Sequence, residues 1–194
     1  MIELIEVETE RLRLRQWTAT DRAPFAELNG DPRVMEFFPA PLSRIESDAM
    51  ADHCQALIAE RGWGVWAVEM KSARTFIGSV GLHVPALELP FSPCVEIAWR
   101  LAAKYWGSGF ATEAARAALN AGFERLGFLE IVAFTATINT RSRAVMERLG
   151  MRDANEPFEH PQVRAGHELR PHCLYRLALA DYRADHVGDY GSKQ

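Results

Sequence analysis

The segment AWRLAAKYWGSGFATEA, residues 98–114, carries the strongest indication of the fold. A strand-like stretch runs into the turn Gly107-Ser108-Gly109 and then directly into a helical pattern from Thr112. Glycine permits backbone angles and close approaches that a side chain would block. The free N–H groups at a helix start point outward and favour a negative ligand. The segment therefore predicts an anion site of the kind that holds a phosphate.

Two other interpretations of these glycines stay open at this point. Glycine is common at turns, so a purely structural strand-to-helix turn is the first. The second is a dinucleotide-binding turn of the G-x-G-x-x-G kind, but Thr112 occupies the place of its third glycine. The next strand also ends in Asn139 rather than in an acid that could hold a ribose, and several strands precede the segment.

The pattern outward from this segment predicts a mixed α/β fold. TERLRLRQW alternates with period two, as a strand does, and Ser43 followed by Glu46 fits a helix capping box. A strand, a helix and a second strand in succession imply one parallel pair. The expected strands cover residues 9–17, 63–70, 75–83, 94–101, 129–138, 151–155 and 172–180, and the expected helices cover residues 20–30, 43–61, 112–126 and 141–149.

Composition bounds the class of protein. The chain of 194 residues, with 48% hydrophobic and 25% charged residues, suits one soluble domain over residues 1–184 with a flexible tail at 185–194. Its 22 basic residues against 26 acidic ones give a formal charge of −4, which argues against nucleic-acid binding.

The cysteines, the histidines and the apolar runs indicate the cellular location of the protein and whether it binds a metal. Cys54, Cys94 and Cys173 are scattered and odd in number, which argues against a disulfide framework and a thiolate zinc site. The histidines around His160 and His172 lack the tight spacing of metal ligands, so we expect no metal. No apolar run approaches the ~20 residues that span a bilayer. We therefore expect a cytoplasmic protein with no membrane partner.

Residues 98–151 resemble the central motif of the GNAT acetyltransferases, and their sequence is similar to that of the RimJ/RimL-like branch. The matching pieces, in order, are EIAWRL at 96–101, YWGSGFATEA at 105–114 and NTRSRAVMERLGM at 139–151. The similarity covers most of residues 9–180. It implies the acyl-CoA N-acyltransferase (GNAT) fold: a central, mostly antiparallel sheet with one parallel splayed pair and helices on both faces.

The resemblance implies acetyl-CoA as co-substrate. The family's glycine turn has Gln or Arg where Trp106 stands, so a charged contact is lost, although backbone N–H groups carry most of the phosphate binding. The pantetheine arm would pair with the strand at 97–100. The implied cofactor-binding residues are Ile97, Ala98, Trp99, Arg100, Trp106, Gly107, Ser108, Gly109, Phe110, Ala111, Thr112, Asn139 and Ser142.

The resemblance also implies catalytic residues. Glu96 is the candidate base, acting through a water; the alternatives are that it positions a cationic substrate or faces solvent. Many relatives protonate the departing thiolate with a tyrosine, but Met146 stands at that position and cannot donate. Ser142 matches the donor of the RimJ/RimL-like branch, with helix capping as its alternative role, and Tyr175 is the fallback donor.

The predicted activity is acetyl-CoA-dependent N-acetylation of a primary amine. A protein N-terminal α-amine is the acceptor of the RimJ/RimL-like branch. The alternatives are a small amine or antibiotic as acceptor, or a CoA-binding sensor without catalysis, for which Trp106 and Met146 are the supporting features. Related folds often form homodimers, so a homodimer is the oligomer to test for.

Overall fold

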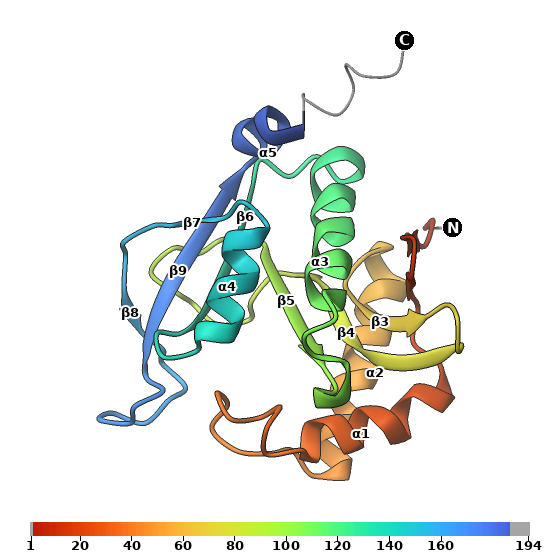
Figure 1. Ribbon diagram of the computed structural model, residues 1–194. Helices are drawn as coiled ribbons and strands as arrows, with labels where there is room; N and C mark the ends of the chain where they lie inside the picture. Colours follow the sequence, from red (N-terminus) through yellow and green to blue (C-terminus); the bar gives the residue numbers. More distant parts are fainter. Residues whose placement is uncertain (1, 187–194) are drawn as a thin grey trace. The chain divides into compact units, whose positions relative to one another are not determined.

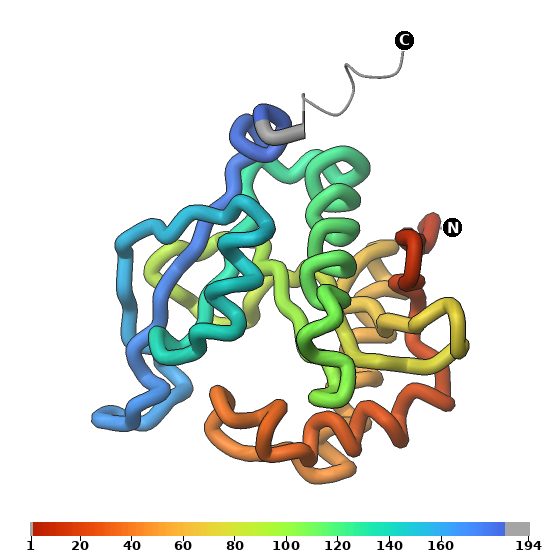
Figure 2. Tube along the Cα trace, viewed as in Figure 1, coloured from red at the N-terminus to blue at the C-terminus, as the bar shows by residue number. Residues whose placement is uncertain are grey.

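The computed structural model describes residues 2–186 (Figures 1 and 2). The chain divides into two compact units, which we describe separately. The first unit runs to His83 and includes Ile97–Ala118, and the second comprises Val84–Glu96 and the chain from Leu119 onward. A single domain over residues 1–184 stays a prediction. Of the predicted tail, residues 185 and 186 end a helix and the rest lies outside the described residues.

The first unit is built on an antiparallel sheet that the alternating sequence predicted. Leu12 and Leu14 are fully buried and pair with Met70 and Val68 of the neighbouring strand, which confirms the period-two strand. Along the sheet the order is β1 (Val7–Glu8), β2 (Leu12–Arg15), β3 (Val65–Met70), β4 (Thr75–His83) and β5 (Glu96–Leu101).

Three helices belong wholly or mainly to this unit. They are α1 (Arg22–Gly30), α2 (Arg44–Arg61), which passes behind β3 and β4 in Figure 1, and α3 (Phe110–Asn120). The Ser43–Glu46 capping box is confirmed, and Gly62 ends α2 with a φ of 84°. Helix α3 begins at Phe110 rather than Thr112, and the rest of the predicted helix is a π-helical turn over Ala121–Arg125.

The second unit contains the predicted parallel pair. Glu96, the first residue of β5, pairs in parallel with Val132, whose N–H donates to the Val95 carbonyl over 2.9 Å. Val132 lies on β6 (Glu130–Ala136), which pairs antiparallel with β9 (Pro171–Ala178) on its other side, so the sheet is mixed and the predicted α/β fold class is confirmed. Two short strands, β7 (Arg152–Asp153) and β8 (Phe158–Glu159), also pair antiparallel with β9.

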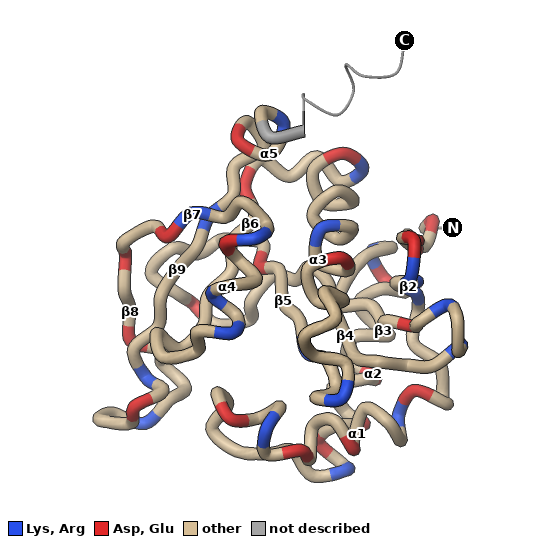
Figure 3. Tube along the Cα trace, in the orientation of Figure 1, with Lys and Arg blue, Asp and Glu red and all other residues tan. Residues whose placement is uncertain are grey.

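Two helices complete the second unit, α4 (Thr140–Arg148) and α5 (Leu179–His186). Helix α5 corrects the expected strand at 172–180, which ends at Ala178. Strand β8 lies in a segment predicted to be a loop, because a two-residue strand shows no periodicity in the sequence. None of the helices within residues 2–186 is long and apolar enough to cross a membrane. Basic and acidic residues are interspersed along the trace (Figure 3).

Candidate active site

The glycine turn of the first unit has the conformation that the sequence predicted. Gly107 and Gly109 have φ angles of 75° and 80°, in the region that side chains disfavour. A Cβ built on Gly107 meets nothing within 4 Å, so its backbone conformation, not crowding, requires glycine there. The turn is exposed and leads into Phe110, the first residue of α3. The first N–H groups of α3 therefore lack carbonyl partners within the helix and favour an anion.

An arginine far away in the sequence holds this turn. Arg11 Nη1 donates to the Ser108 carbonyl over 3.0 Å, and Arg11 Nε donates to Glu113 over 2.6 Å. The guanidinium also lies 4.4 Å from the centre of the Phe110 ring. Burial alone would raise the pKa of Glu113, but hydrogen bonds from Thr9 and Arg11 lower it, so the carboxylate stays charged at neutral pH. Arg11 therefore positions both the turn and the first turn of α3.

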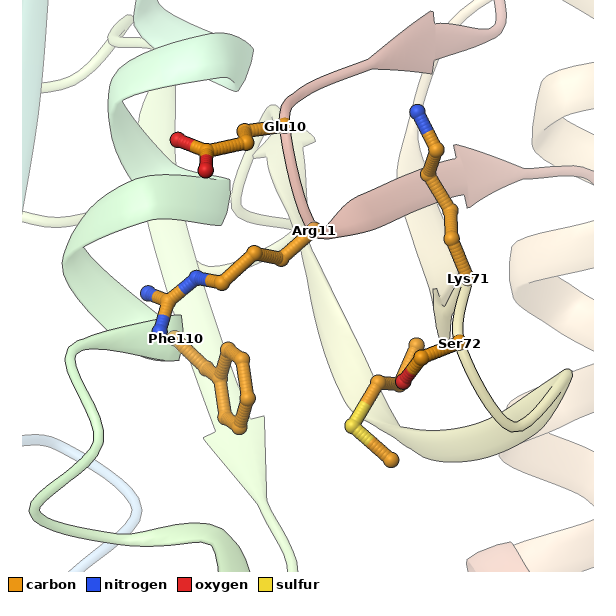
Figure 4. Close-up of a pocket in the computed structure, with 6 residues that line it drawn as sticks. Glu10, Arg11, Lys71, Ser72 and Phe110 are labelled. Carbon is orange, nitrogen blue, oxygen red and sulfur yellow. The ribbon is translucent and has the colours of Figure 1, made fainter.

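The role of Arg11 is not predictable from the sequence, because Arg11, Arg13 and Arg15 alternate like the solvated face of a strand. The contact joins Arg11 to Ser108, 97 positions apart, and no local sequence pattern predicts it. Figure 4 shows Arg11 extending towards Phe110, while Lys71 points away from it. A pocket of about 210 Å³ lies here, lined by Glu10, Arg11, Met70, Lys71, Ser72 and Phe110.

The strand before the turn is half-buried. Ile97 is buried, whereas Ala98, Trp99 and Arg100 are partly accessible. Trp106, which stands where the resembling family has Gln or Arg, donates its indole N–H to the Leu101 carbonyl over 2.9 Å. It therefore ties the turn to the end of β5 instead of offering a charge.

In the second unit, Asn139 caps α4. Its Oδ1 accepts from the Ser142 N–H over 3.1 Å, and its Nδ2 donates to Thr135 Oγ1 over 2.9 Å and to Ser142 Oγ over 3.1 Å. The cap is therefore Asn139, and Ser142 does not cap the helix. The Ser142 hydroxyl accepts from Asn139, and within residues 2–186 its own proton has no acceptor.

Tyr175 lies on β9 with only 2% of its surface exposed. Its hydroxyl accepts from Arg143 Nε and donates to Glu147 Oε1, each over 3.3 Å. Burial raises the pKa of Tyr175, and Arg143 partly opposes that shift. The phenol is therefore a satisfied group, whereas the Ser142 proton is available.

Glu96 is buried, with 9% of its surface exposed. Its neighbour Cys94 has a raised pKa, first because of burial and then because of the Glu96 charge. Two histidines of the same unit, His160 and His172, belong to an aromatic cluster. The His160 and His172 rings lie 4.7 Å apart, next to Phe158, and burial lowers the pKa of His172 to about 4. No group of three His, Cys, Asp or Glu side chains within residues 2–186 could hold a metal ion.

Comparison with known proteins gives a consistent picture. The family model described as an acetyltransferase (GNAT) domain matches residues 11–152. The Bacillus subtilis (strain 168) protein YkkB is 34% identical over 146 residues, which is 74% of this chain and 83% of that protein. The FsC-acetyl coenzyme A-N(2)-transacetylase of Aspergillus fumigatus is 32% identical over 152 residues, or 75% of this chain and 64% of that protein.

A solved structure also shares the fold. The ribosomal-protein-S5-alanine acetyltransferase from Vibrio fischeri superposes with a TM-score of 0.72, over 92% of this chain and 98% of that one. Its sequence is 17% identical, so the likeness concerns the fold alone.

Proposed function

Because this chain belongs to the GNAT acetyltransferase family, we propose that it transfers the acetyl group of acetyl-CoA to a primary amine. Membership of the family makes the chain an acyltransferase, and acetyl-CoA is the co-substrate that the domain implies. The observation that carries the proposal is the exposed Gly107–Gly109 turn, which leads into the free N–H groups at the start of α3. A diphosphate is the group that such a turn recognises best.

In this proposal the diphosphate of acetyl-CoA binds to the amides of residues 106–112. The pantetheine arm pairs with the backbone of residues 97–100 as an added strand does. Asn139 is the proposed hydrogen-bonding partner of the arm. Its side-chain amide already serves Thr135 and Ser142, so we assign that role to its remaining acceptor capacity on Oδ1.

The reaction needs a neutral amine and a proton for the departing thiolate. An α-amine with a pKa near 7.8 is held charged at pH 7 by only about 1 kcal/mol, whereas a lysine near 10.4 needs about 4.6 kcal/mol. We assign the base role to Glu96, acting through a water. We assign proton donation to Ser142, since its hydroxyl proton has no acceptor within residues 2–186, and not to Tyr175, whose hydroxyl already donates to Glu147.

For the acceptor we propose an α-amine of the kind found at a protein N-terminus. Two observations support this choice. The sequence of residues 96–151 is similar to the RimJ/RimL-like branch, and an α-amine needs little assistance from a base to lose its proton near neutral pH. A small amine is the second candidate, because the Aspergillus fumigatus relative is named as an FsC N(2)-transacetylase. An inactive CoA sensor is the third, because Trp106 and Met146 replace functional groups of the family motif.

The test follows free thiol release from acetyl-CoA in the presence of an amine panel: peptides that start with Ser, Ala or Thr, polyamines and aminoglycosides. Release with peptides alone would support the N-terminal acceptor, and release with small amines alone would support the second candidate. Calorimetric binding of CoA with no release from any amine would support the sensor. The absence of CoA binding would refute the proposal.

A further inference from the structure

Arg100, in the first unit, has no carboxylate partner within residues 2–186, and its printed hydrogen-bond contacts lie on α1 and α2. Arg100 extends from β5 to α1 and α2, where its Nη1 donates to Asn29 Oδ1 over 2.6 Å. The same nitrogen lies 3.8 Å from the Met50 sulfur, and the guanidinium lies 4.2 Å from the centre of the Phe38 ring. The residue as a whole is partly exposed.

Arg15, in the same unit, is an arginine whose charge is paired with carboxylates, and it serves as a comparison for Arg100. Its guanidinium contacts Asp21 over 2.7 Å and Glu69 over 2.8 Å. Arg100, by contrast, has no carboxylate within hydrogen-bonding distance in residues 2–186, and its Nε and Nη2 have no acceptor there. Three of its five N–H donors are therefore unused within these residues.

The surroundings do not neutralise this charge. Burial lowers the pKa of Arg100 to about 10, which still leaves the guanidinium charged at neutral pH. Burial also raises the pKa of the nearby Cys54 thiol to about 11, so that thiol is uncharged. Removing a cation from water without a partner is costly, and the remedy is a paired, hydrogen-bonded anion.

The position of the fork is fixed by a second layer of contacts. Asn29 is fully buried, and its Nδ2 donates to Ser47 Oγ over 2.9 Å, so its Oδ1 is held towards Arg100. Phe38, with 38% of its surface exposed, flanks the guanidinium from the segment that precedes α2. A preorganised guanidinium with Nε and Nη2 unused is suited to grip a planar carboxylate through two parallel hydrogen bonds.

We propose that Arg100 binds a carboxylate of the acceptor, so that the acceptor is an amine that also carries a carboxylate. This inference rests on the proposed acetyltransferase function and names the substrate class of the same enzyme. The diphosphate of acetyl-CoA is assigned to the turn at 106–112, where the neighbouring arginine is Arg11. The anion at Arg100 is therefore a separate one. Its source is either the α-carboxylate of a free amino acid or an acidic side chain at a protein N-terminus.

The experiment compares acceptors that carry a carboxylate with acceptors that carry the corresponding amide. Thiol release is measured with the L-amino acids against their C-terminal amides, and with peptides that begin with Glu or Asp against those that begin with Gln or Asn. We expect kcat/KM to favour the acid by about ten- to a hundredfold in one of the two sets, which identifies the source. Equal kcat/KM for acid and amide in both sets would overturn the inference and leave the proposed function intact.

Substitutions at Arg100 test the residue itself. Arg100→Gln can still donate to Asn29, and we expect it to bring the acid-to-amide ratio to about one while the melting temperature stays equal or rises, since an unpaired charge is removed. Arg100→Lys keeps the charge without the fork and should retain part of the preference. Arg33→Gln, at an exposed arginine paired with Asp31, is the matched control. An unchanged ratio in Arg100→Gln would refute the assignment.

A binding measurement covers the case in which no acceptor reacts. Calorimetry with 3-phenylpropionate and 3-phenylpropionamide needs no turnover, so it separates failure of the inference from failure of the proposed function. Binding of the acid to the wild-type protein and not to Arg100→Gln would support the carboxylate site even if the chemistry were reassigned. Equal titrations of acid and amide would refute it.

Discussion

Gly107 and Gly127 form a matched pair that separates the cost of backbone strain from the loss of a binding site. Their φ angles are 75° and 71°, and a Cβ on either residue meets nothing within 4 Å. Alanine at either position is therefore penalised only for its left-handed backbone. That penalty is about 1–2 kcal/mol, which corresponds to a fall in Tm of about 2–8 °C for a chain of this size.

Only Gly107 lies in the proposed diphosphate turn. If Gly107→Ala shifts the turn enough to lose one charge-assisted hydrogen bond, CoA binding weakens by about 1.5–3 kcal/mol, or about ten- to a hundredfold in Kd. Differential scanning fluorimetry measures the stability of both variants, and calorimetry measures their affinity for CoA. We expect similar losses of Tm in both and a loss of affinity in Gly107→Ala alone. Equal CoA affinities in the two variants would refute the assignment of the turn.

Three further predictions concern the second unit. Ser142→Ala should lower kcat by about ten- to a hundredfold with little change in the Kd for CoA, and a steady-state assay that finds kcat unchanged would move the donor role elsewhere. Glu96→Gln should reduce kcat/KM most at low pH, where the amine is most protonated; a pH–rate profile that matches the wild type would remove Glu96 from the mechanism. His172 has a folded pKa of about 4 against an ordinary 6.5, so the unfolded state binds more protons between these values and stability rises with pH across them, by about 3 kcal/mol. Denaturant titrations from pH 4 to pH 7 should show this slope, a His172→Phe variant should lack most of it, and an identical slope in both proteins would contradict the assignment.

Local patterns in the sequence predicted the parts of the fold that local physics determines. The Ser43–Glu46 capping box and the alternation around Leu12 and Leu14 each depend on neighbours within a few residues, and both are confirmed. The turn at Gly107 was predicted for the same reason. Strand β8 and helix α5 were not predicted, because they are short and depend on packing against β9 or on the end of that strand.

The contacts that organise the candidate site were beyond local patterns. Arg11 meets Glu113 across 102 positions, and Arg100 meets Asn29 across 71. In the sequence each of these side chains resembles an ordinary polar surface residue, because the neighbouring residues do not indicate its hydrogen-bond partner in the folded protein. The alternative role of Ser142 in capping was likewise open until the hydrogen bonds showed that Asn139 is the cap.

The link from Arg11 to the glycine turn has a consequence for the order in which the chain is made. The ribosome synthesises the strand that carries Arg11 about a hundred residues before the helix that carries Glu113. Arg11 therefore cannot form its contacts with Ser108 and Glu113 until the chain has been synthesised as far as α3. A fusion or trimming at the amino end that disturbs residues 9–11 would remove a contact of the glycine turn, even though it leaves every residue of that turn in place.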